Sequence, residues 1–95
     1  EVRIPAAAAA EPPARRDLRE GQVIRLRYLL RAAAVKSAND AATAIGFAIG
    51  GSVEGFAARM NATAAAMGMT QTRFVNMHGL TEAGHYSTAR DMSIL

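Results

Sequence analysis

The stretch Lys36–Ala42 places the strongest constraint on the fold of this chain, because it separates two runs rich in alanine and leucine. Apolar residues recur at helical spacing on both sides of it, so one helix is predicted to end here and another to begin. Ser37 and Asp40 have the spacing of a capping box, in which each side chain binds a free N–H at the start of the second helix. The sequence therefore predicts two helices that meet at a tight junction.

Four helices are predicted from the spacing of apolar residues and from the residues that start and stop them. The first two cover residues 27–35 and 39–49. Ser52 is placed to cap a third helix, which ends at Gly68. A further capping box at Thr88 opens the last helix. The predicted fold class is mainly α, a small helical cluster with minor extended pieces.

The remaining segments are predicted to be short and weakly structured. Residues 23–26 are expected to form a short strand, residues 70–75 a second extended piece, and residues 76–84 a loop containing glycines. Residues 1–16 are expected to form an exposed linker or loop, because their alanine tract lies between prolines and is too short to hold a helix alone. The chain is thus divided into this linker and a helical unit over residues 17–95.

The composition limits what the helical unit can bury and bind. There is no Cys and no Trp among the 95 residues, so disulfides and thiolate metal sites are excluded. No apolar run approaches the roughly 18 residues of a membrane span, so membrane contact is expected only through segments outside this chain. The first residue is Glu, which suggests a piece of a longer protein, and any export signal is expected upstream.

The basic residues suggest nucleic-acid binding, and the histidines suggest metal binding. The net charge is +3, and six arginines lie between Arg15 and Arg31. Acidic residues are interleaved with them, which favours a solvated face over a nucleic-acid site. His78 and His85 flank Glu82, but a metal site normally needs three or four ligands, so loop hydrogen bonding and no metal are expected. A small basic nucleic-acid binder stays as an alternative function.

Short motifs follow one another in a characteristic order from about residue 17 to residue 95. They are Ser37-Ala38-Asn39-Asp40-Ala41-Ala42, Gly50-Gly51-Ser52, Phe56, Met60-Asn61, Met67-Gly68-Met69, Thr72, Phe74, Asn76, Gly79-Leu80 and Tyr86-Ser87-Thr88-Ala89-Arg90-Asp91. Taken together, this set resembles the serine D-alanyl-D-alanine carboxypeptidases, the low-molecular-weight penicillin-binding proteins. In that resemblance, Ser37-Ala38-Asn39 is the second active-site motif of the family, Ser-x-Asn.

The resemblance implies a fold, an activity and a location. The chain is expected to be the helical subdomain of the α+β serine β-lactamase and penicillin-binding-protein-like fold, in an enzyme of the bacterial periplasm or extracytoplasmic envelope. That enzyme removes terminal D-alanine from peptidoglycan stem peptides without a cofactor and is acylated by β-lactams. Ser37 is expected to relay a proton to the departing D-alanine. Asn39 is expected to hold either the amide carbonyl of the substrate or the catalytic base.

Two other motifs of the family are missing from this sequence. Lys36 is the single lysine, and Ala33 stands where a Ser-x-x-Lys motif would need serine. Ser37 stands where a Lys-Thr-Gly motif would need threonine. The nucleophile helix and the Lys-Thr-Gly strand are therefore expected in the rest of the same enzyme, and the isolated chain is expected to be inactive. A non-catalytic helical interaction module is the main alternative.

Overall fold

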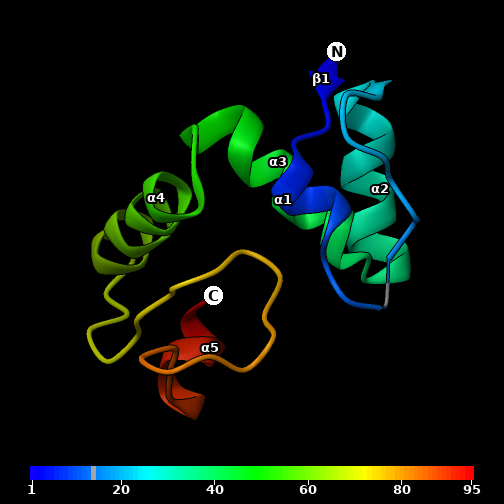
Figure 1. Ribbon diagram of the computed structural model, residues 1–95. Coiled ribbons are helices and arrows are strands. Elements are labelled where there is room, and N and C mark those ends of the chain that lie inside the picture. The colour runs from blue at the N-terminus through cyan, green and yellow to red at the C-terminus, as the bar shows by residue number, and fades with distance from the viewer. Residues whose placement is uncertain (14) are drawn as a thin grey trace.

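The computed structural model describes residues 1–13 and 15–95 (Figure 1). Its elements, in chain order, are β1 (Val2–Arg3), α1 (Ala6–Ala9), β2 (Val23–Ile24), α2 (Leu26–Lys36), α3 (Asn39–Gly50), α4 (Val53–Ala66) and α5 (Ala89–Ile94). The predicted mainly helical fold class is confirmed.

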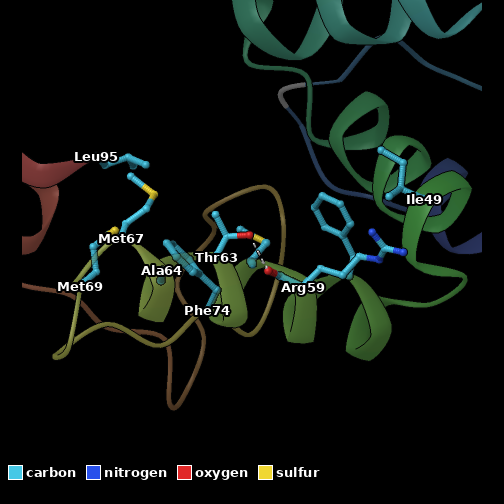
Figure 2. Close-up of a pocket in the computed structure, with 10 residues that line it drawn as sticks. Ile49, Arg59, Thr63, Ala64, Met67, Met69, Phe74 and Leu95 are labelled. Carbon is cyan, nitrogen blue, oxygen red and sulfur yellow. Dashed lines mark hydrogen bonds between the residues drawn. The ribbon is translucent and has the colours of Figure 1, made fainter.

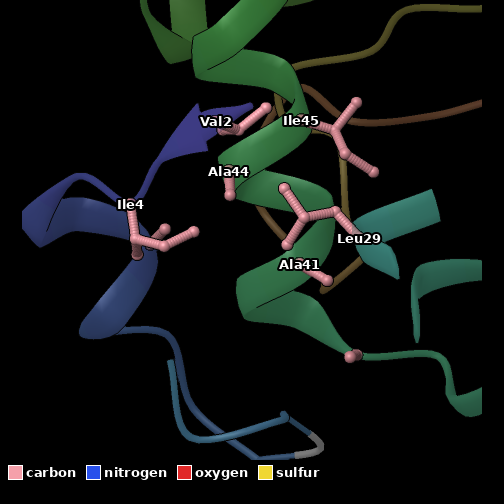
Figure 3. Packing of buried hydrophobic residues seen from close by; sticks show 8 residues of the cluster. Val2, Ile4, Leu29, Ala41, Ala44 and Ile45 are labelled. Carbon is pink, nitrogen blue, oxygen red and sulfur yellow. The ribbon is translucent and has the colours of Figure 1, made fainter. Parts of the chain in front are cut away.

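Helix α3 lies at the centre of the core. Most of its first eight residues are buried, and it packs against α1, α2, α4 and β1. Figure 3 shows Ile4 and Leu29 beside Ala41 and Ala44 of this helix. Alanine side chains let the neighbouring segments approach closely, and full burial of each leucine or isoleucine contributes about 1.5–3 kcal/mol. The helix that begins at the junction is thus the element around which α1, α2, α4 and β1 pack.

The N-terminal segment differs from its prediction. Strand β1 pairs with β2 in antiparallel register, with Val2 opposite Ile24. Val2, Ile4 and Ala8 are buried in the core cluster around α3. The expectation of an exposed linker is wrong for these residues, because pairing with β2 and packing on α3 stabilise a segment that local propensity alone does not. The N-terminal segment therefore belongs to the packed unit.

The helix limits agree with the prediction to within about two residues. Ser52 Oγ accepts a hydrogen bond from the Gly55 N–H, and Thr88 Oγ1 accepts one from the Asp91 N–H, as expected of caps. The extended piece over residues 70–75 is not a strand, and its one β-bridge joins Arg73 to Tyr86.

The side chain of Asn61 explains why no strand forms there. Asn61 Nδ2 donates to the Phe74 carbonyl and Asn61 Oδ1 accepts from the Phe74 N–H, so these backbone groups are satisfied without a neighbouring strand.

No single helix in the described part of the chain is long and apolar enough to cross a membrane. Helices α3 and α4 taken together have suitable length and composition, but they bend by 83° at the break between them. Because α3 is largely buried within the protein, its apolar character is explained by its place in the core.

One glycine inside α3 and one in the first turn of α4 give a stability prediction. A Cβ at Gly55 would clash with the backbone oxygen of Gly50, whereas a Cβ at Gly46 would clash with the terminal methyl group of Met77 and lie 3.1 Å from Met77 Cγ and 3.3 Å from Phe56 Cδ2. Gly55→Ala should lower the free energy of unfolding by about 1–3 kcal/mol, because backbone cannot move aside. Gly46→Ala should lower the free energy of unfolding by less than Gly55→Ala does, because the methionine end can rotate and alanine favours helix.

Urea unfolding of the full-length protein that contains this chain measures both glycine variants. Equal losses of stability in Gly55→Ala and Gly46→Ala would contradict the prediction that a clash with backbone costs more than a clash with the end of a side chain.

Candidate active site

The junction between α2 and α3 is made by a residue in the left-handed conformation. Ser37 ends α2 with φ 53° and ψ 35°, and its N–H and that of Ala38 both point to the Ala32 carbonyl. Glycine is the usual residue in this position, and a residue with a Cβ costs roughly 1–2 kcal/mol more there. Backbone strain of this kind is common at functional sites. The junction thus holds a serine in a conformation that stability alone would assign to glycine.

Ser37 does not take the role of helix cap that its spacing predicts. The N-cap of α3 is Ala38, which makes no side-chain cap hydrogen bond, and the side chain of Asp40 turns elsewhere. The capping-box prediction is wrong here because the left-handed turn moves Ser37 one residue outside the cap position. Ser37 is exposed. Lys36 is also exposed.

Asn39 is nearly buried, with a relative exposure of 6%. Its Nδ2 donates to the carbonyl oxygen of Pro12 at 3.2 Å. A carboxamide has two N–H donors and an acceptor oxygen, so this bond uses one N–H and leaves a second N–H and Oδ1 for a ligand. The bond also fixes the plane of the carboxamide.

Asp40 is fully buried, although it carries a carboxylate. Both of its oxygens accept from the Arg16 N–H at 2.9 Å, Oδ2 also accepts from the Leu18 N–H at 3.0 Å, and Oδ1 from the Ala41 N–H at 2.8 Å. Backbone donors therefore satisfy the carboxylate, and its position in the first turn of α3 suits the helix dipole. Sequence reasoning assigned this residue only as a cap.

Glu11 makes a second connection close to Pro12. Its carboxylate accepts from the Thr43 hydroxyl of α3 and lies 2.8 Å from His78 Nε2. The other ring nitrogen of His78 accepts from the Leu80 N–H, so the imidazole links the N-terminal segment to the loop over residues 76–84. Both predicted loop histidines thus form hydrogen bonds, since His85 Nδ1 accepts from a backbone N–H as well.

The described part of the chain contains no group of three or more His, Cys, Asp or Glu residues arranged to hold a metal ion. Glu82, which the sequence places between the two histidines, accepts instead from the side-chain amide of Asn76. The three residues therefore have separate hydrogen-bonding roles.

Among the hollows of the described residues, the two with the largest volumes lie along different helices. One of about 320 Å³ is lined by residues of α2 and by Arg16, and includes Lys36, the neighbour of Ser37 in the chain. The other, of about 430 Å³, is an apolar groove along α4, and Figure 2 shows Met67 and Leu95 at one end of it and Ile49 at the other. Neither hollow is lined by Ser37 or Asn39. The larger groove is therefore separate from the junction.

Comparison with known proteins decides the family. The family model for D-alanyl-D-alanine carboxypeptidases, peptidase S11, matches residues 4–95. The chain belongs to this family. The match includes the N-terminal segment from Ile4 as well as the helices, in agreement with the packing of that segment on α3.

Individual relatives agree with this assignment. The chain is 42% identical over 78 residues to D-alanyl-D-alanine carboxypeptidase DacF of Bacillus subtilis and 38% identical over 78 residues to DacC of Escherichia coli, covering 82% of this chain and 20% of each relative. A crystal structure of the carboxypeptidase DacD from Francisella tularensis superposes with a TM-score of 0.93 at 35% identity, covering 98% of this chain and 22% of that one. The chain thus spans about a fifth of the length of these family members and has the fold of one helical part of them.

Proposed function

We propose that this chain is the helical wall of the active site in a serine D-alanyl-D-alanine carboxypeptidase. The enzyme removes the terminal D-alanine from peptidoglycan stem peptides outside the inner membrane of a bacterium, and it is acylated by penicillin. The nucleophile helix and the Lys-Thr-Gly strand belong to the remainder of the same enzyme. The reaction needs no cofactor, because a serine supplies the nucleophile.

The reaction begins with the hydroxyl of a serine that lies outside these 95 residues. Its oxygen attacks the carbonyl carbon between the two D-alanines, and its proton passes to a base. The C–N bond then breaks, terminal D-alanine leaves with a proton on its amine, and an ester links the remaining peptide to the serine. Water hydrolyses this ester and restores the hydroxyl.

Ser37 serves this cycle as a proton carrier. Its hydroxyl is both a donor and an acceptor, so it accepts the proton from the base and delivers it to the leaving amine. The exposure of Ser37 supports this role.

Asn39 contributes through its second Nδ2 N–H and its Oδ1, which the hydrogen bond to Pro12 does not use. The second N–H of Nδ2 is suited to the amide carbonyl of the substrate, and Oδ1 is suited to a cationic base. The bond to Pro12 holds the carboxamide before substrate arrives, which is the condition for effective electrostatic stabilisation of a transition state.

The observation that carries the proposal is the junction itself. An exposed serine in the left-handed conformation and a nearly buried asparagine lie two residues apart, within a segment that matches the carboxypeptidase family. A purely structural junction has no need of the serine, since glycine fits this conformation with less strain.

Release of D-alanine tests the proposed activity. The full-length protein that contains this chain should release D-alanine from a peptide ending in D-Ala-D-Ala and none from the same peptide ending in L-alanine. Labelled penicillin should attach covalently and stop the release. The 95-residue chain alone should do neither, because loss of the nucleophile costs on the order of a millionfold in rate. A full-length protein that neither releases D-alanine nor takes the label would contradict the proposal.

A further inference from the structure

The buried carboxylate of Asp40 connects two segments that are far apart in sequence. It accepts backbone N–H groups from Arg16 and Leu18, which precede it by 24 and 22 residues. It also accepts the N–H of Ala41, the next residue in α3. Since Asp40 adjoins Asn39, the same carboxylate holds the start of α3 and the chain that passes beside it.

The segment that contains Pro12 and Arg16 also orients the side chain of Asn39. Pro12, four residues before Arg16, offers its carbonyl to Asn39 Nδ2. On the other side of Pro12, Glu11 is held by the Thr43 hydroxyl and by His78. Glu11 before Pro12 and Arg16 after it are thus each bound to a side chain of α3.

Resting on the proposed function, we infer that Asp40 is a positioning residue for catalysis. Its carboxylate fixes residues 16–18 against the first turn of α3, and thereby keeps the Pro12 carbonyl where it orients Asn39. Asp40 itself is fully buried behind Asn39 and needs no contact with substrate. Asp40 affects the reaction only by setting the position of the Asn39 carboxamide.

The variant Asp40→Asn removes this function with little change of shape. Only Oδ1 accepts a hydrogen bond from the Ala41 N–H, and only Oδ2 accepts one from the Leu18 N–H. An amide keeps a single acceptor oxygen, so one of these two N–H groups would face an NH₂ group. The segment next to Asn39 would then shift, and a displacement of about 1 Å in a catalytic group lowers rates by up to about 100-fold.

Asp91 provides a matched control. It is 1% exposed, lies in the first turn of α5, and accepts the Gln71 N–H and the Thr72 hydroxyl. Asp91→Asn therefore makes the same chemical change at another buried helix start, away from the Ser-x-Asn junction. Both donors of Asp91 meet Oδ2, so its amide can keep both bonds, and only Asp40→Asn should slow acylation.

The test is the rate of acylation by labelled penicillin in the full-length enzyme, corrected for the folded fraction measured by circular dichroism. We expect Asp40→Asn to be about 10- to 100-fold slower than the unmodified enzyme and Asp91→Asn to be within about twofold of it. Should Asp40→Asn fail to fold, Asp40→Glu replaces it, because the extra methylene displaces residues 16–18 while the charge is kept. Equal rates in the Asp40 and Asp91 variants would overturn the inference.

A double-mutant cycle with Asn39→Ala separates positioning from a general loss of structure. If Asp40 acts through Asn39, Asp40→Asn should have no further effect on acylation once Asn39 is alanine. Additive losses of rate in the double variant would overturn the inference and leave the proposed function intact. If Asn39→Ala alone leaves acylation unchanged, the proposed role of Asn39 fails as well.

Discussion

The full-length protein carrying Ser37→Gly should be more stable than the unmodified protein and yet react far more slowly with penicillin. Ser37 has φ 53°, a conformation in which glycine avoids the steric cost of a Cβ, so the free energy of unfolding should rise by about 1 kcal/mol. Loss of a hydroxyl that carries protons should slow acylation by about 100- to 10,000-fold. Stability is measured by urea unfolding and acylation by the rate of label incorporation.

Ser37→Ala is the matched variant for this prediction. It removes the same hydroxyl and keeps the Cβ, so acylation should fall as far as in Ser37→Gly while stability stays close to that of the unmodified protein. A Ser37→Gly enzyme that gains stability and keeps its full acylation rate would show that the serine has no part in the chemistry.

The second large effect is expected for Asn39→Ala. Removal of a positioned amide that stabilises charge in the transition state should slow acylation by about 100- to 1,000-fold. The cost in stability should be only about 1 kcal/mol, because the Asn39 side chain contributes one hydrogen bond, to Pro12. The acylation rate and the urea midpoint of the same preparation give both quantities.

Asn61→Ala is the control for Asn39→Ala. Asn61 makes two hydrogen bonds to the backbone of Phe74 from helix α4, and it lies among the residues that pack the C-terminal loop. Asn61→Ala should therefore cost at least as much stability as Asn39→Ala and leave the acylation rate of the folded enzyme unchanged. The account is contradicted if the Asn61 variant is the slower of the two.

Helices α2, α3, α4 and α5 were predictable because their signals are local, whereas α1 lies in the segment expected to be a linker. Apolar spacing and the caps Ser52 and Thr88 lie within the elements they define, and the structure has both caps in place. The junction at Ser37 was found at the right position with the wrong geometry, since serine at a helix boundary is usual as a cap and unusual in a left-handed turn.

The parts that sequence reasoning missed depend on contacts between distant residues. Ile4 is buried because its N–H and carbonyl bind Gln22 and Gly21 and its side chain meets α3, none of which is visible in an alanine tract between prolines. The role of Asp40 was missed for the same reason, because its main donors lie more than 20 residues upstream. The catalytic expectation for Ser37 and Asn39 came from a motif, and spacing alone gave no reason to prefer chemistry over capping.

The most direct test is a crystal structure of the full-length protein after reaction with penicillin. The account predicts that the penicilloyl group is bonded to a serine outside these 95 residues. It also predicts that the Asn39 carboxamide lies within hydrogen-bonding distance, about 2.7–3.2 Å, of the acyl amide or of the catalytic base, with the Ser37 hydroxyl facing the same group. An acyl group bonded elsewhere, with neither Ser37 nor Asn39 facing it, would contradict the claim that this junction forms one wall of the active site.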